Sequence, residues 1–263
     1  MLQIIKKLNV PKVILRHIMM EFLDLQTIKK VILTVKEMNI LIDHNKSFLY
    51  RAKQGFIWNC VNNNMDVLHW LYNNNCVEYH HYAFSGACRN GHVDIAKWLC
   101  SLGHLNFDGN NCDKIAFRDA CAFGHIDACK FIHSLGKIDI HVYNDAFVKS
   151  CDGGHIDIAK WLYSLGGIDI HAQKDDAFIY ACQRNHLNVA QWLHSLDHIS
   201  SVDYDYLFAF ACSNGYFVMA QWLHSLGHID IYANNNFALI SSRERGYTNI
   251  VQWLSILAEE LLE

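Results

Sequence analysis

The chain has 263 residues, of which 52% are hydrophobic and 18% are charged, and its formal net charge is −4. A chain of this length and composition can bury a large core, which excludes disorder, collagen and a coiled coil as its main state. One proline, ten cysteines and seventeen histidines stand out, and the last two counts raise the question of disulfides or a metal site.

The first 55 residues differ in charge from the rest. Residues 1–55 carry ten Lys/Arg and four Asp/Glu, whereas residues 56–263 carry twelve and twenty-two. This shift predicts two domains, a helical N-terminal segment of residues 1–55 and a second part of residues 56–263. The acidic second part is poorly suited to a phosphate backbone, so we expect no nucleic-acid partner.

The opening sequence MLQIIKKLNV lacks the uninterrupted apolar stretch that is typical of a secretory signal. The chain also lacks an apolar run of about 18 residues, so we expect no membrane span. We therefore expect an intracellular protein, in the cytoplasm, whose cysteines stay reduced.

Two amphipathic helices are predicted within residues 10–48. Apolar residues recur at helical spacing, first at Ile14, Ile18 and Phe22 and then at Ile28, Val31, Ile32 and Val35. The sequence Leu23–Asp24–Leu25 separates the two groups.

A nine-residue pattern recurs through the second part. Its copies are NNMDVLHWL (63–71), GHVDIAKWL (91–99), GHIDACKFI (124–132), GHIDIAKWL (154–162), NHLNVAQWL (185–193), GYFVMAQWL (215–223) and GYTNIVQWL (246–254). The aromatic residue at the eighth place recurs at Trp70, Trp98, Phe131, Trp161, Trp192, Trp222 and Trp253, where it is predicted to be a core position. Seven copies near this period predict a solenoid of stacked units.

Each unit is predicted to be two helices, a turn between them and a loop. The first helix has the form F-x-x-A-C-x-x-G, as in FRDACAFG (117–124), and Asp145 and Asp176 are placed to cap two such helices. The glycine that follows supplies the turn. The second helix places Ile158, Trp161, Leu162 and Leu165 on one apolar stripe.

This unit resembles the ankyrin repeat. A-C-x-x-G-H, the I-A-K-W-L helix and the G-x-I-D-I loop match the family pattern, and the match covers residues 56–258. The family's TPLH tetrapeptide is missing, and Trp replaces the usual Leu on the second helix. The variant is similar to ankyrin proteins that are abundant in giant viruses of amoebae. The resemblance implies an all-α ankyrin-repeat solenoid of about seven helix-turn-helix units.

The repeat explains most cysteines and histidines. Six cysteines occupy one place in successive copies: Cys60, Cys88, Cys121, Cys151, Cys182 and Cys212. Stacked helices lie about 8–10 Å apart, too far for a disulfide or a shared zinc ion between equivalent places. We therefore predict small buried hydrophobic residues there, with no metal site and no cofactor. His80 and His81 near Cys76 form the least periodic group of these residue types.

No catalytic motif accompanies the repeats. The sequence lacks GxSxG, GxxxxGK[ST] and GxGxxG. Any Cys–His pair would recur in every copy, which packing requires and catalysis does not. We therefore predict a protein that is not an enzyme and has no catalytic residues.

The ankyrin resemblance implies a concave surface that binds a partner protein. In the family, contacts come from the residues just before the inter-helix glycine and from the hairpin tips. The first set here is Arg89, Asn90, Ala122, Phe123, Asp152, Gly153, Gln183, Arg184, Ser213, Asn214, Glu244 and Arg245. The tips include Asn110, Asn111, Asn144, Lys174, Asp175, Asn234 and Asn235. Phe123 is the aromatic anchor that we expect to matter most.

The N-terminal segment resembles an F-box, through Pro11, an apolar helix, FLDL (22–25) and a second helix. The gap from Pro11 to Leu23 is one residue longer than in the commonest form. The resemblance implies docking on the Skp-type subunit of a cullin–RING ubiquitin ligase through Pro11, Ile14, Ile18, Phe22, Leu23 and Ile28. A plain helical cap on the first repeat would show similar helices. Two hypotheses follow: a substrate adaptor of a host ligase, or a stand-alone binding scaffold.

Overall fold

The computed structural model describes residues 55–73, 77, 80–105, 112–136, 138, 140–196, 199, 202–227 and 229–260. These residues form helices joined by turns and contain no strand, so the all-α prediction is confirmed for them. The chain divides into two compact units, Met1–Ala116 and Phe117–Glu263. The predicted F-box residues, from Pro11 to Ile28, lie outside the described residues.

The first unit contains two helix pairs and the start of a third. Residues 55–61 are helical and precede α6 (Met65–Asn73). The second pair is α7 (His80–Arg89) and α8 (Val93–Ser101), and α9 (Cys112–Ala122) begins the third. These bounds match the predicted order of first helix, turn and second helix.

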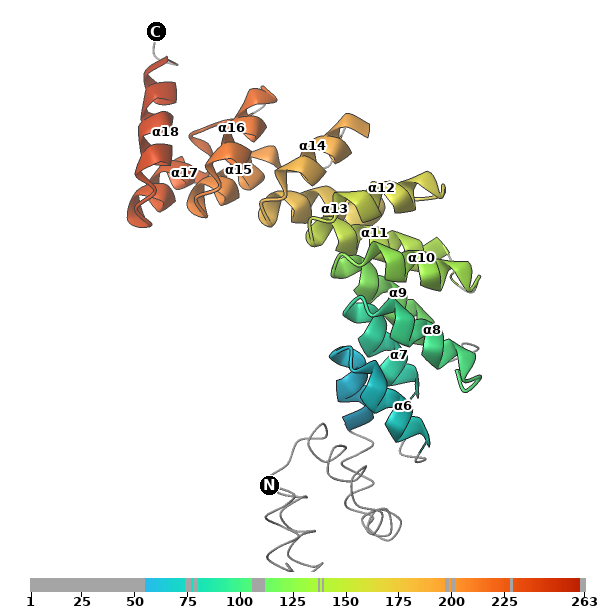
Figure 1. Cartoon of the computed structure of the whole chain (residues 1–263). Coiled ribbons are helices and arrows are strands. Elements are labelled where there is room, and N and C mark those ends of the chain that lie inside the picture. Colours follow the sequence, from blue (N-terminus) through green and yellow to red (C-terminus); the bar gives the residue numbers. More distant parts are fainter. Residues whose placement is uncertain are drawn as a thin grey trace, which may run out of the picture. The chain divides into compact units, whose positions relative to one another are not determined.

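The second unit continues the same order from the end of α9. Its helices are α10 (Ile126–Ser134), α11 (Ile140–Asp152), α12 (Ile156–Ser164), α13 (Ala172–Gln183), α14 (Leu187–Leu196), α15 (Tyr204–Ser213), α16 (Phe217–Ser225), α17 (Ala233–Glu244) and α18 (Thr248–Glu260). The first helices α11, α13, α15 and α17 pack on one another in chain order, and each also contacts its own second helix. Figure 1 shows these helix pairs following one another along the unit.

The core repeats in the same way as the sequence. The phenylalanine and the cysteine of the first helix are buried in repeat after repeat, as at Phe147 and Cys151. The described cysteines are free thiols, and burial raises the pKa of Cys151 and of Cys212 to about 12. These side chains therefore stay protonated at neutral pH and behave as the small hydrophobic residues that the sequence predicted.

One cysteine pair is closer than the repeat pattern suggested. Cys129 on α10 stands where four other second helices have alanine, and its Sγ lies 3.2 Å from Sγ of Cys121 on α9. Both side chains are buried. Within the described residues, no group of three or more His, Cys, Asp or Glu side chains is arranged to hold a metal ion.

The prediction of the repeated aromatic place as a core position needs correction, because its described tryptophans are half-buried: Trp98, Trp161, Trp192, Trp222 and Trp253. Each ring packs against the phenylalanine of the preceding repeat's first helix, with centroids 6.3 Å apart for Trp161 and Phe117 and 6.0 Å apart for Trp253 and Phe208. Each tryptophan thus joins two neighbouring repeats.

Two further expectations about the repeat unit are wrong. Leu165 is 40% exposed because it is the C-cap residue of α12 and lies past its last turn. Asp145 lies inside α11, where its carboxylate is 3.8 Å from Arg118, and so it caps no helix. Asp176 follows three residues with left-handed φ and makes no cap hydrogen bond. A carboxylate does cap α15, where Asp203 accepts from the amide of Tyr206 at 2.9 Å.

The turn glycines have the predicted left-handed conformation, with φ of 77° at Gly154, and Asn185 adopts 61° where a copy lacks glycine. The histidine after this turn reaches back one repeat. Nε2 of His155 donates to the backbone carbonyl of Ala122 at 3.1 Å. Nε2 of His186 likewise donates to the backbone carbonyl of Asp152 at 3.0 Å. Each acceptor follows a repeated cysteine, so these histidines connect adjacent repeats.

Candidate protein-binding surface

The residues just before the inter-helix turn residue, Gly or Asn185, lie at the C-terminal ends of the first helices, and we call them the helix-end row. In the first unit the row consists of Arg89 and Asn90, and in the second unit of Phe123, Asp152, Gln183, Arg184, Ser213, Asn214, Glu244 and Arg245. Most of these side chains are exposed or half-buried. Phe123 is 49% exposed, as its predicted role requires.

Ser213 is the exception in the row. It is only 4% exposed, and its hydroxyl donates to the carbonyl of Phe210 at 2.9 Å. The next first helix, α17, packs over α15 and covers this position. Its prediction as an exposed contact residue is therefore corrected.

The hairpin tips are also only partly as predicted. Lys174, Asn234 and Asn235 are exposed, and each has a left-handed φ. Asp175 is 2% exposed, because its carboxylate turns inward and lies 2.6 Å from Nδ1 of His171. Asn144 lies inside α11, not at a tip, and its side chain accepts a hydrogen bond from the amide of Asp169 in the next loop. Asn110 and Asn111 lie outside the described residues.

Two arginines of the row in the second unit differ in their electrostatic partners. Nε of Arg184 donates to the carboxylate of Asp152 at 3.0 Å, which compensates its charge. Nη1 of Arg245 donates to two neutral acceptors, the carbonyl of Ser213 at 2.5 Å and Oδ1 of Asn214 at 3.3 Å. Arg245 forms no ion pair with any described residue, so its positive charge is not compensated.

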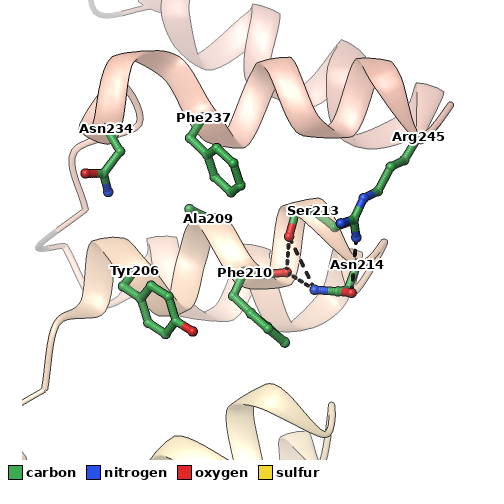
Figure 2. A pocket seen from close by; sticks show the side chains of 8 residues that line it. All are labelled: Tyr206, Ala209, Phe210, Ser213, Asn214, Asn234, Phe237 and Arg245. Carbon is green, nitrogen blue, oxygen red and sulfur yellow. Dashed lines mark hydrogen bonds between the residues drawn. The ribbon is translucent and has the colours of Figure 1, made fainter.

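A groove lies beside Arg245, between α15 and α17 (Figure 2). Its volume is about 440 Å³, and its lining residues are Tyr206, Ala209, Phe210, Ser213, Asn214, Asn234, Phe237 and Arg245. In Figure 2, Phe237 points from α17 towards α15, and Arg245 and Asn214 close one end of the groove. Arg245 is the only charged side chain among the lining residues.

The aromatic part of the groove was not recognised from the sequence. Tyr206 is 46% exposed and Phe237 is 47% exposed, while Phe210 lies with its ring centroid 6.2 Å from that of Tyr206. A signal was available: Tyr206 and Phe210 are one helical turn apart on a face that the repeat's core positions do not use.

The family model for ankyrin repeats (many copies) matches residues 145–194. The helix pairs that flank this stretch carry the same buried phenylalanine and cysteine, the same turn and the same order of helices. The chain therefore contains ankyrin repeats. Ankyrin repeats bind protein partners, which makes this chain a protein–protein interaction module.

A solved ankyrin-repeat domain is among the structures that are similar to this chain. The crystal structure of the human ASB11 ankyrin repeat domain is similar to this ankyrin-repeat chain with a TM-score of 0.49 and 16% sequence identity, over 65% of this chain and 81% of that chain. No curated protein matches the sequence. Among the described helices of this ankyrin-repeat protein, none is long and apolar enough to cross a membrane.

Proposed function

We propose that the chain recognises a partner protein through the helix-end row of its second unit, in the cytoplasm and without catalysing a reaction. The observation that carries the proposal is that the first helices have a buried side of repeated residues and an exposed end of variable residues. Phenylalanine and cysteine recur on the buried side, as at Phe178 and Cys182. The row positions other than the buried Ser213 change from copy to copy and are exposed or half-buried, so packing does not dictate them.

The raised pKa values of the buried thiols support a cytoplasmic, non-catalytic role. Burial raises the pKa of Cys60 to about 12 and that of Cys100 to about 11, so neither is a ready nucleophile at neutral pH. Free thiols in the described part of the chain also suit a reducing compartment.

The finer proposal is that the chain is a substrate adaptor. In it, residues 10–48 dock on the Skp-type subunit of a host cullin–RING ubiquitin ligase, and the ankyrin repeats select the protein to be modified. The FLDL sequence and the two amphipathic patterns of the N-terminal segment support this assignment. The alternative is a binding scaffold that sequesters its partner, with the N-terminal helices as a simple cap.

Co-purification distinguishes these two. The full chain, residues 51–263 and a full-length variant with Phe22→Asp and Leu23→Asp are each expressed with a Skp-type subunit. An adaptor recovers the subunit only with the unmodified full chain. Equal recovery in all three samples, or none in any, contradicts the adaptor proposal and leaves the scaffold. The double variant is the sharper test because every repeat is retained.

A further inference from the structure

We infer that the groove between α15 and α17 binds a partner segment that combines an apolar anchor, preferably aromatic, with an Asp or Glu side chain. The anchor lies on Tyr206, Phe210 and Phe237, and the carboxylate pairs with Arg245. The inference rests on the proposed function, because it specifies the chemistry of the partner at one place on the surface.

The apolar half of the inference follows from exposure. Tyr206 and Phe237 each leave almost half of their surface in solvent, and Ile240, one helical turn from Phe237, is 49% exposed. Tyr206 and Phe237 lie on two adjacent helices and both line the groove, so covering their apolar surface with a ligand is favourable. Aromatic rings favour an aromatic partner through edge and stacking contacts.

The acidic half follows from charge. Both described acceptors of Arg245 are neutral and accept from Nη1, so Nη2 and Nε can still donate to a carboxylate. Residues 56–263 carry ten more acidic than basic groups, as their twenty-two Asp/Glu and twelve Lys/Arg show. A cation without an acidic partner at this end of the groove favours an acidic group at that point and disfavours a basic one.

The two ends of the groove also differ in charge. Asp203 and Asp205 lie at the Tyr206 end, where Asp203 caps α15 and Asp205 accepts from the amide of Asp230 at 2.8 Å. Arg245 lies at the other end (Figure 2). The partner's carboxylate therefore belongs near Arg245, and its apolar anchor lies towards Tyr206.

The helix geometry sets the spacing of the two groups. Phe237 and Arg245 are eight positions apart in the sequence, which corresponds to about 12 Å along a helix. An extended peptide advances about 3.3 Å per residue, so its apolar and acidic residues should be about three or four positions apart. The predicted motif is an aromatic or large aliphatic residue, a short spacer and an Asp or Glu.

Selection from random peptides tests the inference without a known partner. Phage that display short random peptides are panned on the full chain, on Arg245→Gln, on Phe237→Ala and on the matched control Arg184→Gln. We expect the unmodified chain and the control to enrich the apolar–spacer–acidic motif, and the two groove variants not to. Arg184 is the control because it lies in the same row and its charge is already paired with Asp152.

The best selected peptide is then synthesised with a fluorescent label, and its affinity is measured by polarisation. We expect Arg245→Gln and Phe237→Ala each to weaken binding about tenfold or more, and Arg184→Gln to change it less than about twofold. Replacing the peptide's acidic residue by its amide should give the same loss as Arg245→Gln. Thermal unfolding of each variant verifies the fold, and Phe237→Ala covers the case in which Arg245→Gln is destabilised.

Enrichment of peptides without an acidic residue, enrichment that survives both groove substitutions, or no enrichment at all would each overturn the inference. The first two results would leave the proposed function intact, because the chain would still bind peptides elsewhere or by other contacts. A separate experiment, cross-linking from positions of the helix-end row, tests the proposed function itself.

Discussion

Nε2 of His155 donates a hydrogen bond to the carbonyl oxygen of Ala122, which lies 33 residues earlier in the chain. The same imidazole covers the preceding turn, where a Cβ added to Gly124 would lie 2.6 Å from Cε1 of His155. One side chain therefore fixes the distance between two repeats and also requires glycine in the neighbouring turn. His186 has the same relationship to Asp152 and Gly154.

Removal of this connection should lower stability without changing the helices. We expect His155→Ala to reduce the free energy of unfolding by about 1–2 kcal/mol, because a half-buried carbonyl loses its hydrogen bond and the ring contact is lost as well. Urea denaturation followed by circular dichroism measures the loss. Lys130→Ala, an exposed position on α10, is the matched control and should change stability by less than about 0.5 kcal/mol. Equal effects from the two substitutions would contradict this role.

Substitution of the turn glycines by alanine should lower stability by two different amounts, depending on the space around the added Cβ. Gly154 and Gly136 both have left-handed φ, 77° and 74°, so alanine is strained at either. A Cβ at Gly154 would also meet the His186 ring, whereas nothing lies within 4 Å at Gly136. We expect Gly136→Ala to cost about 1 kcal/mol and Gly154→Ala about 1–3 kcal/mol more. Thermal unfolding of the two variants gives the comparison, and similar costs would refute the ring contact.

Stability should fall as the pH is lowered below neutral. Burial lowers the pKa of His155, and burial with the neighbouring His104 and His81 lowers that of His80. A histidine whose pKa is lower in the folded state binds its proton more readily when unfolded, so stability is retained above the unfolded pKa of about 6.5 and lost as the pH falls through it. Urea titrations across pH 5 to 7.5, roughly the range in which histidine titrates, should show a smaller slope in His155→Gln.

The half-buried tryptophans should matter more than their exposure suggests. Trp161 packs against Phe117 and against His133, with ring centroids 6.3 Å and 5.6 Å apart. We expect Trp161→Leu, which restores the residue type that ankyrin repeats usually carry, to cost about 1–2 kcal/mol because the neighbouring repeat loses its aromatic contact. Trp58, which is 56% exposed, is the control, and Trp58→Leu should be nearly neutral. Unfolding monitored by circular dichroism avoids the change in tryptophan fluorescence.

The repeat architecture could be predicted from the sequence because each copy of the pattern packs against another copy of the same pattern. One copy's buried phenylalanine and cysteine imply those of the next, and the helix periodicity identifies the buried side of each helix. The sequence did not show how far each helix extends or what the next repeat covers. Asp145 fell inside α11 because the helix begins earlier than its apolar pattern, and Ser213 was lost from the surface because α17 covers it.

The groove could not be predicted for a related reason. Tyr206 and Phe237 belong to different repeats and lie 31 positions apart, so no local pattern connects them. Their proximity depends on the packing of α15 on α17. Arg245 was predicted as a contact residue, but its partners could not be predicted. Arg184 pairs with the carboxylate of Asp152, whereas Arg245 donates to the neutral carbonyl of Ser213.

Phe123 is the residue whose loss should separate binding from folding. Its side chain is 49% exposed at the end of α9, so Phe123→Ala should leave the unfolding temperature nearly unchanged. We expect the same substitution to weaken binding of a partner protein about tenfold, as truncation of an interface anchor does. A pull-down titration against the partner captured by the unmodified chain measures this effect. Unchanged affinity would remove Phe123 from the binding surface.

Site-specific photo-cross-linking tests the central claim most directly. A photoreactive amino acid is placed in the full chain at Phe123, Arg184 or Glu244 of the helix-end row, and at Lys130 or Gln221 on the exposed side of the second helices. We predict that the row positions cross-link to a partner protein in cells and that the second-helix positions do not. Equal cross-linking from both sets, or cross-linking from the second helices alone, would contradict a partner-binding surface at the row.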